Sequence, residues 1–394
     1  MTGDDDLDQD SSIAFRNSLK EHFGDLTDYR RQGSIRYGLI DILFITMCAV
    51  ISGANDLKAV AMYAQRKQRW LVTILELTEG IPSYTTFWTI FALLSPTALE
   101  QSFVQWVQSK LKARNESADD RNVSIDGKAQ RGTTKKGKPH SFVHIVSAWA
   151  TAHQLTLGQL KVDGKSNEIT AIPQLLDMID VEGATITIDA MGCQTAIAEK
   201  IVDKGGDYIL ALKGNQGHLS DEIENYFTQA EHVDFEGVIF DGLGSKNHAH
   251  GRIEKREIYI TEDIDWLLQK DDWKNFKTII MIKSERTILA QPTSIERRYY
   301  ISSLPANALR AANAIRGHWG IENQAHWILD VAFREDEQNA NAGNIAENMS
   351  MIRRLSLNLL KQDKTAKCGI EIRRQMAGWD DEYLLKILGI KCFS

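Results

Sequence analysis

Residues 184–212 read ATITIDAMGCQTAIAEKIVDKGGDYILAL. The run 184–188 predicts a strand that leads directly into Asp189, and the run 208–212 predicts another strand. Between them, residues 195–204 have the apolar spacing of a helix. A strand, a helix and a second strand in this order are typical of an α/β fold, so this stretch sets the fold class.

Upstream of this unit, the sequence predicts three more strands. Residues 123–125 indicate a strand that ends at Asp126, and residues 143–152 and 155–162 indicate two strands around a short turn. Residues 168–180 are amphipathic and predict a helix. Three strands, a helix, a strand, a helix and a strand make the order of an RNase H-like α/β domain.

The rest of the chain divides by composition and pattern. We expect an acidic disordered tail at 1–12, a helical N-terminal domain at 13–115, a first part of the RNase H-like core at 120–214, a β-rich insert at 215–304, a second part of the core with the Glu322 helix at 305–360, and a helical C-terminal tail at 361–394. The insert should form a mainly β module that hangs from the core. The short N-terminal helices fit either a DNA-reading helix-turn-helix or a plain helical bundle.

A second informative segment, residues 316–330, reads RGHWGIENQAHWILD. Four of its side chains, His318, Glu322, His326 and Asp330, recur every fourth residue and therefore share one face of a helix. An acid displayed from an otherwise packed helix is what a metal-dependent nuclease site uses. The segment thus predicts that Glu322 is a functional acid.

Asp126, Asp189 and Glu322 together suggest a DDE-type DNA transposase. Phosphodiester cleavage needs one oxygen activated and another stabilised, which two Mg²⁺ ions can do. Mg²⁺ prefers oxygen ligands, so Asp126 is expected to bridge both ions while Asp189 and Glu322 each complete one; Mn²⁺ is expected to substitute. A competing interpretation uses His318, Glu322 and His326 as zinc ligands.

The bulk composition indicates an ordinary soluble protein. The 394 residues suffice for two or three domains, and the four cysteines form no C-x-x-C pair. The longest apolar run, 42–52, is too short to span a bilayer, and the aspartate-rich first ten residues are unlike a secretory signal. We therefore expect a cytoplasmic protein without a membrane partner.

The net charge of −7 counts against nucleic-acid binding as a bulk property, so DNA contacts should come from local basic clusters. One such strip surrounds Asp126, and others follow the last core strand and lie in the insert. We expect backbone contacts to DNA from these polar and basic residues: Lys128, Arg131, Lys213, Asn215, Gln216, His250, Arg252 and Arg256. Lys128 and Arg131 also fit a solvated loop, residues 213–216 also fit a plain turn, and residues 250–256 also fit a purely structural strand.

Several motifs around the acids resemble the H-repeat-associated transposases of bacterial insertion sequences, within the DDE transposase superfamily. The motifs are GIPSYTTF (80–87), SIDGKAQRG (124–132), IDAMGCQ (188–194), YILALKGNQ (208–216), HGRIEKR (250–256) and RGHWGIENQAHWILDVAFRED (316–336). This resemblance covers most of the chain. It implies an RNase H-like core, a β insert before the last acid, two divalent metals, and cutting and joining of double-stranded DNA at element ends and in a target.

The chain departs from related transposases at the positions that flank the last acid. Those proteins typically have Arg four residues before the Glu and Lys seven after it, whereas this chain has His318 and Leu329. Arg316, His326 or Asp330 would then fill part of the role of these flanking residues, and Arg316, His318 and His326 are expected to contact DNA. Two other functions stay open, a non-catalytic DNA-binding protein and a host nuclease derived from such an ancestor, and a homodimer is also left open.

Overall fold

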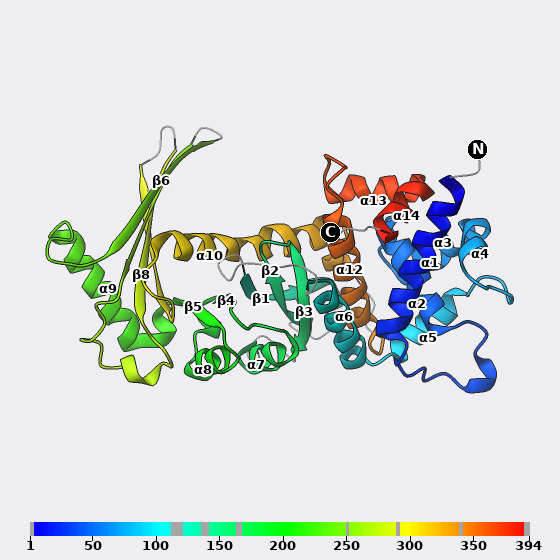
Figure 1. Ribbon diagram of the computed structural model, residues 1–394, viewed down its shortest axis with the longest axis horizontal. Coiled ribbons are helices and arrows are strands. Elements are labelled where there is room, and N and C mark those ends of the chain that lie inside the picture. The colour runs from blue at the N-terminus through cyan, green and yellow to red at the C-terminus, as the bar shows by residue number, and fades with distance from the viewer. Residues whose placement is uncertain are drawn as a thin grey trace.

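The computed structural model describes residues 4–111, 121–134, 142–162, 168–249, 252–288, 292–338 and 342–389. The molecule is elongated and is built around one nine-stranded sheet (Figure 1). Helices from both ends of the chain gather at one end of the molecule, and strands β6 to β8 rise at the other. His250, which was expected to contact DNA, lies outside the described residues.

The first five strands form the half of the sheet that carries the candidate acids. They are β1 (Asn122–Gln130), β2 (Val143–Ala150), β3 (Leu155–Val162), β4 (Thr185–Ile188) and β5 (Asp207–Leu212). The strand order is β3-β2-β1-β4-β5, with antiparallel pairs around β2 and parallel pairs around β4. Helices α7 (Glu168–Met178) and α8 (Thr195–Asp203) connect β3 to β4 and β4 to β5. The predicted order of elements and the mixed α/β class are confirmed.

Four more strands extend the same sheet. They are β6 (Asp241–Ala249), β7 (Arg252–Thr261), β8 (Thr278–Ile288) and β9 (Ser294–Ser302). β9 pairs antiparallel with β5, and β8, β7 and β6 follow in turn. The expectation that residues 215–304 form a β module that merely hangs from the core is therefore wrong. Without β9, β5 would be an edge strand with unpaired backbone groups, and β9 satisfies them.

Two elements in this region were not predicted. Helix α9 (Gly217–His232) buries Leu219, Ile223 and Phe227, which recur every fourth residue and pack toward β9. This helical spacing is visible in the sequence, but it lies inside a stretch that otherwise reads as strands. Strand β6 has the composition DGLGSKNHA, which lacks the alternating apolar residues of a strand, and its backbone pairing with β7 holds it in place.

One long helical segment lies against the sheet and carries Glu322 (Figure 1). It consists of α10 (Ala308–Gly320), a π-helical turn (Ile321–His326) and α11 (Trp327–Val331). Ala311 and Ala314 of α10 share a hydrophobic cluster with strand residues, because small side chains let the helix approach the sheet closely. A π-helical turn within a helix often occurs at a functional site.

The remaining helices belong to the two ends of the chain. They are α1 (Asp4–Phe23), α2 (Leu39–Ile51), α3 (Leu57–Arg66), α4 (Gln68–Ile74), α5 (Tyr84–Leu93), α6 (Pro96–Leu111), α12 (Ile345–Gln362), α13 (Ile370–Trp379) and α14 (Asp381–Gly389). The N-terminal and C-terminal helices share one hydrophobic core. The buried guanidinium of Arg374 on α13, for example, donates to the backbone oxygens of Val50 and Ala54.

Residues 4–12 were expected to belong to a disordered tail but are the first turns of a helix, and residues 1–3 lie outside the described part of the chain. α1 begins at Asp4, and its buried residues Phe15, Leu19 and Phe23 form the face that packs toward α2 and α14. Acidic residue types favour the N-terminal end of a helix, so the charge that suggested disorder is compatible with a helix start. Among the described residues, no helix is long and apolar enough to cross a membrane.

Candidate active site

Two of the three candidate acids lie side by side where the parallel pairing of two central strands, β1 and β4, ends. The parallel pairing of β1 with β4 ends at Ile125 opposite Ile188, and Asp126 and Asp189 are the next residues on each strand. Strand β1 does not end at Asp126 as predicted, because its antiparallel pairing with β2 continues to Gln130. Asp126 is therefore held within a paired strand, while Asp189 begins the 3₁₀ turn Ala190–Gly192.

The stripe of polar residues on the long helical segment lies over β1 and β4. His318 Nδ1 lies 3.0 Å from Thr187 Oγ1 on β4. Further along, His326 Nδ1 lies 3.4 Å from Asp126 Oδ2, and Asp330 Oδ1 lies 2.6 Å from the Nζ of Lys128. Glu322 lies between His318 and His326 on this stripe, so the helix brings it to the same edge of the sheet as the two aspartates.

Asp126, Asp189 and Glu322 all line one pocket of about 660 Å³, together with His318 and Lys213, and we call it the acid pocket. Their carboxylates are oxygen donors, which suit Mg²⁺. Among the described residues, however, no three His, Cys, Asp or Glu side chains are grouped closely enough to hold a metal ion. The donor chemistry thus fits a magnesium site, while the carboxylates in this structure stand apart around the pocket.

Burial and neighbouring charge set the protonation behaviour of Asp189. Burial raises the pKa of its carboxyl, and the carboxylates of Asp126 and Glu168 raise it further. The backbone amide of Gly192 opposes this effect, because Asp189 Oδ1 accepts hydrogen bonds from the backbone nitrogens of Met191 and Gly192. A cation in the pocket would relieve the repulsion between the acids.

Charge also couples Asp126 and His318 to their neighbours in this region. Burial alone would raise the pKa of Asp126, but the contact with His326 and the charge of His318 outweigh it and lower that pKa. Burial lowers the pKa of His318, although the carboxylates of Asp126, Asp189 and Glu322 act in the opposite direction. His318 therefore lies where the negative potential of the three acids meets.

His318 and His326 each contact a residue of the strands. His318 Nδ1 lies against Thr187 and His326 Nδ1 against Asp126. His326 is buried, which keeps it from gripping a phosphate, whereas His318 lines the pocket and its contact with DNA stays a prediction. The two histidines also contact different partners, which does not support a zinc site built from His318, Glu322 and His326. They instead connect the helix that carries Glu322 to the strands that carry the aspartates.

Lys128 is also placed differently from the prediction that it contacts DNA. Its side chain is buried, and its Nζ lies 2.6 Å from Asp330, 3.3 Å from Asp336 and 3.4 Å from Glu335. Burial alone would lower the pKa of Lys128, but these carboxylates outweigh it and raise the pKa, so the lysine stays charged. The pKa of Asp330 is nevertheless raised, because burial and the two other acids outweigh one shared lysine.

Sequence reasoning missed the buried charges behind Lys128. Glu335 is fully buried and accepts from the Nη1 of Arg354 and from the Oγ of Ser350, each at 2.9 Å. Arg353 and Arg354 are both buried on α12. The available signal was the pair of adjacent arginines within the apolar spacing of this helix. A buried arginine is almost always paired, so buried acidic partners could have been expected.

The residues after β5 brace the turn that carries Asp189. The side-chain amide of Asn215 donates to the backbone oxygen of Ala190 at 2.6 Å, and that of Gln216 donates to the backbone oxygen of Cys193 at 2.5 Å. These amides are therefore engaged within the protein rather than free for DNA. Lys213 is exposed and lines the acid pocket, and Arg131 is exposed at the end of β1.

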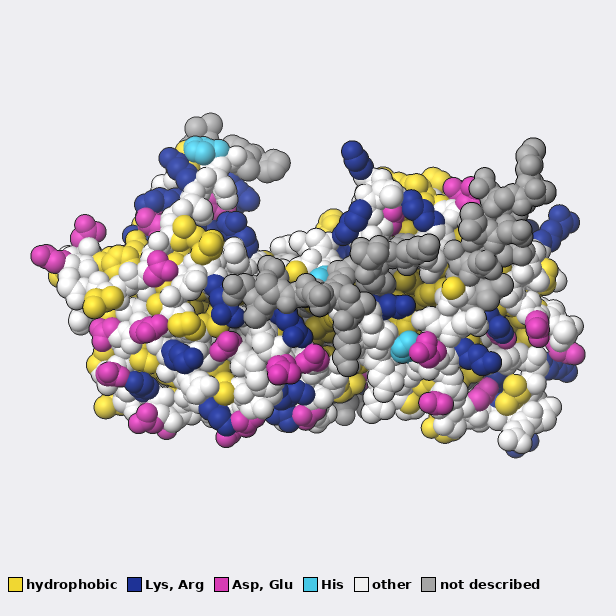
Figure 2. Space-filling view, in the orientation of Figure 1, with side chains coloured by type: hydrophobic (Ala, Val, Ile, Leu, Met, Phe, Trp, Pro, Cys, Tyr) yellow, Lys and Arg dark blue, Asp and Glu magenta, His cyan; other side chains and the backbone are white. Residues whose placement is uncertain are grey.

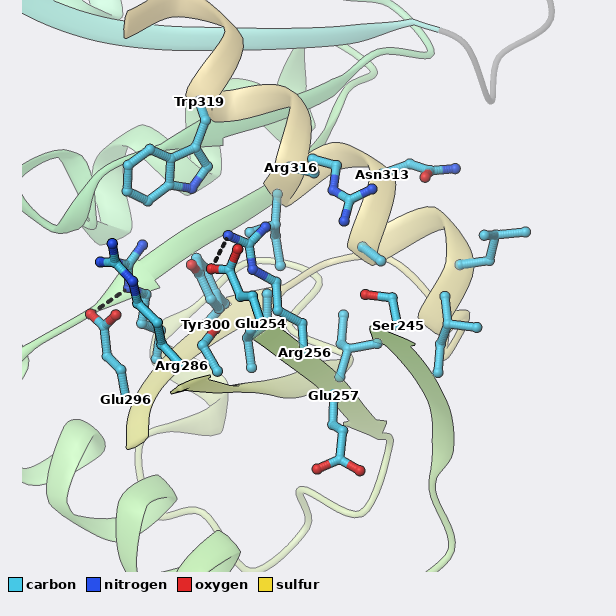
Figure 3. A pocket seen from close by; sticks show the side chains of 18 of the residues that line it. Ser245, Glu254, Arg256, Glu257, Arg286, Glu296, Tyr300, Asn313, Arg316 and Trp319 are labelled. Carbon is cyan, nitrogen blue, oxygen red and sulfur yellow. Dashed lines mark hydrogen bonds and ion pairs between the residues drawn. The ribbon is translucent and has the colours of Figure 1, made fainter. Parts of the chain in front are cut away.

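A second groove of about 660 Å³ adjoins the acid pocket between α10 and strands β6 to β9 (Figure 3). Arg316 and Trp319 line it from the helix, while Arg256 and Arg286 line it from the strands. The groove and the acid pocket share the residues Glu296, Arg298, Tyr300, Ile315 and Trp319. Lys and Arg side chains gather on the arm of β6 to β8 (Figure 2), and Arg252 is exposed on it.

Charge in this groove is partly compensated by pairs within single strands. Arg256 Nη2 donates to Glu254 at 2.8 Å, and Arg298 Nε donates to Glu296 at 2.9 Å. The guanidinium of Arg298 also lies 4.8 Å from the centre of the Trp319 ring, within the range of a cation–π contact. The groove therefore offers arginine groups and an aromatic ring beside the three acids.

Comparison with known proteins identifies two matching family models. One is described as "Transposase DDE domain" and matches residues 101–359, and the other is described as "DDE_Tnp_1-associated" and matches residues 20–107. The chain is 38% identical to "H repeat-associated putative transposase YhhI" of Escherichia coli (strain K12) over 375 residues, which cover 94% of this chain and 97% of that protein.

Another similar protein is "Putative transposase YncI" of Escherichia coli O157:H7, at 37% identity over 94% of each chain. Among solved structures, the cryo-EM structure of a piggyBac transposase synaptic complex with hairpin DNA aligns with a TM-score of 0.40 and 9% identity, covering 97% of this chain and 78% of that one.

Proposed function

The chain belongs to the transposase DDE domain family and is an insertion-sequence transposase, and we propose that Asp126, Asp189 and Glu322 are its catalytic acids. One observation carries this proposal. Asp126 and Asp189 are neighbours at the carboxyl edge of two parallel strands, and Glu322 lines the same pocket from the helix above them. Ligands of open α/β sheets usually bind at this edge.

We also propose that the first five strands form an RNase H-like core. The order β3-β2-β1-β4-β5, with β1 and β4 parallel, supports this assignment, as does the placement of the two aspartates on β1 and directly after β4. We keep the proposed division into an N-terminal helical part, the core in two parts and the inserted strands, with the insert now joined to the core sheet through β9.

DDE transposases generally use divalent metal ions, and we propose two Mg²⁺ ions, or Mn²⁺, held by the three acids. When bound, such ions activate an attacking oxygen and stabilise a leaving oxygen. The protein's own contribution is to orient the ligands. The backbone of Met191 and Gly192 fixes one oxygen of Asp189, and His326 contacts Asp126. His318 lies against Thr187, among the three carboxylates.

The substrate we propose is double-stranded DNA at the element ends, followed by target DNA. Exposed cations surround the acid pocket, namely Lys213 inside it and Arg316 in the adjoining groove. Arg252 and Arg256 extend this basic path along β7, and Arg131 extends it at the end of β1. Phosphate contacts by such groups would set the register of the DNA over the acids.

The test uses the purified full chain and a plasmid that carries this gene with its flanking genomic DNA. We expect Mg²⁺-dependent strand cleavage and joining by the wild-type protein. Asp126→Asn should reduce both reactions to background while DNA binding is retained, because the substitution removes charge from the pocket but keeps the side-chain size. Asp265→Asn is the matched control, since that carboxylate forms an exposed ion pair with Lys270 on the surface.

The outcomes separate the alternatives. Cleavage by Asp126→Asn at the wild-type rate would refute the assignment of the acids. Wild-type cleavage without joined products would favour a host nuclease. DNA binding by the wild type without cleavage in either Mg²⁺ or Mn²⁺ would favour a non-catalytic DNA-binding protein.

A further inference from the structure

Lys128 joins the strand that carries Asp126 to the helical segment that carries Glu322. It lies two residues after Asp126 on β1, so both side chains point to the same face of the sheet. Its three carboxylate partners, Asp330, Glu335 and Asp336, all follow Glu322 in the chain. The lysine therefore bridges two parts of the active site that are about 200 residues apart in sequence, as the separation of 208 between Lys128 and Asp336 shows.

The spacing of the contacts matches on the strand and on the helix. Asp126 contacts His326, and Lys128 contacts Asp330. Two residues along a strand advance by about 6.6 Å. Four residues along a helix advance by about 6 Å. The two contacts are thus in register, and together they fix both the position and the rotation of the helical segment over β1.

The backbone beyond Lys128 adds an independent constraint. The backbone nitrogen of Arg131 donates to Asp336 at 3.2 Å. A Cβ atom placed on Gly132 would lie 2.1 Å from the backbone oxygen of Asp336, so only glycine permits this approach. The segment that follows α11 is therefore packed tightly against the end of β1, with Lys128 at the centre of the contact.

Burial makes this arrangement depend on the lysine charge. An unpaired buried charge is strongly unfavourable, and the carboxylates around Lys128 would repel one another without it. Glu335 has Arg354 as a second cationic partner, whereas Asp330 and Asp336 have no other cationic partner among the ion pairs of the described residues. Loss of Lys128 should therefore release the end of the helical segment first.

We propose that Lys128 is a positioning residue, which holds the Glu322 helix against β1 and thereby keeps Glu322 on the pocket that Asp126 and Asp189 also line, where a divalent cation would bind. It does not contact DNA. This inference rests on the proposed assignment of Asp126, Asp189 and Glu322 as the catalytic acids. The ion pairs of Lys128 lie outside the acid pocket, but they help to determine how tightly the pocket binds the cation.

The experiment compares Lys128→Met, Lys128→Arg and Lys283→Met with the wild-type full chain. Lys283 on β8 is the matched control, because it also bridges two carboxylates, Glu231 and Glu285, but does not line the acid pocket. Mn²⁺ is the probe. Its binding is measured by calorimetry without DNA, and its half-saturating concentration is measured in cleavage of the plasmid described above.

We expect Lys128→Met to weaken Mn²⁺ binding and to raise the half-saturating Mn²⁺ concentration by about 10–100-fold, as residues that support metal ligands commonly do. Lys128→Arg should recover most of this loss because it keeps the charge. Lys283→Met should lower thermal stability without changing the Mn²⁺ requirement. DNA affinity and its salt dependence should be the same for Lys128→Met and the wild type.

Should Lys128→Met fail to fold, Asp330→Asn provides the second test, because it removes one partner and leaves Lys128 paired with Glu335 and Asp336. An unchanged Mn²⁺ requirement in the folded variant would overturn the inference, as would a reduced salt slope of DNA binding in Lys128→Met. Failure of the proposed function would look different: the wild type itself would bind Mn²⁺ no better than Asp126→Asn does, and the inference would fall with it.

Discussion

Two buried glutamates should respond to pH in opposite directions, and both lie in the core that supports the active site. Glu335 is fully buried; burial alone would raise its pKa, but Arg354 and Lys128 outweigh it and lower the pKa from the usual 4.5 to about 2. Glu100 on α6 is also fully buried, and burial raises its pKa from 4.5 to about 8. Substitution of each by glutamine removes the charge and keeps the shape.

The direction of each stability change with pH depends on whether the folded or the unfolded state binds the proton more tightly. At about 1.4 kcal/mol per pH unit, the lowered pKa of Glu335 stabilises the folded protein by about 3 kcal/mol above pH 4.5. That stability is lost as the pH falls through 4.5 toward 2. Glu335→Gln should therefore lower the free energy of unfolding by roughly this amount at pH 7. The deficit should shrink as the pH falls below about 4.5.

Glu100 should show the reverse dependence. Its raised pKa makes the folded state less stable as the pH rises from 4.5 to about 8, by up to about 5 kcal/mol. Glu100→Gln avoids this loss, and the glutamine oxygen can still accept from the backbone nitrogen of Gln159, which lies 2.6 Å from the glutamate oxygen. The variant should therefore gain stability relative to the wild type between pH 5 and pH 8.

The assay is urea denaturation followed by tryptophan fluorescence at pH 3, 5, 7 and 8. The wild type, Glu335→Gln and Glu100→Gln are compared at each pH, so that each variant acts as the control for the other. A Glu335→Gln deficit that stays constant from pH 7 to pH 3 would refute the reasoning that charge pairing stabilises this carboxylate. A Glu100→Gln difference that does not grow with pH would refute the burial argument.

Three further outcomes are expected. Gly132→Ala should lower the thermal midpoint by several degrees, because its Cβ would collide with the backbone of the segment after α11; an unchanged midpoint would show that this contact yields easily. Asn215→Ala should reduce Mg²⁺-dependent cleavage more than DNA binding, because its amide braces the turn beside Asp189; equal losses in both assays would contradict this role. The Arg286→Ala, Arg316→Ala double variant should reduce the slope of log affinity against log salt by about two, and a slope equal to that of the wild type would show that the groove does not bind DNA.

Much of the core architecture is readable from local pattern. Strands β1 to β5 and helices α7 and α8 follow from apolar spacing, which acts over a few neighbouring positions. The stripe of His318, Glu322, His326 and Asp330 is likewise a local property of a helix. For these elements, the residues that specify the structure are close together in the chain.

Other features depend on contacts between distant residues. The pairing of β9 with β5 turns the insert into part of the core sheet, and β6 exists through its pairing with β7 although its own composition does not favour a strand. Neither can be inferred from a local period, because backbone pairing between strands leaves no mark on either sequence alone.

For the same reason, several polar residues near the acids have contacts in the structure that differ from those expected from the sequence. In sequence, Lys128 follows Asp126 like a loop cation, and only the return of the chain at Asp330, Glu335 and Asp336 buries it among carboxylates. Asn215 and His326 likewise acquire their partners, Ala190 and Asp126, through folding. Local order specifies which side chains share a face, whereas the charge, burial and partners of each one are set by segments that are distant in the chain, because electrostatic energy depends on distance in space and not along the chain.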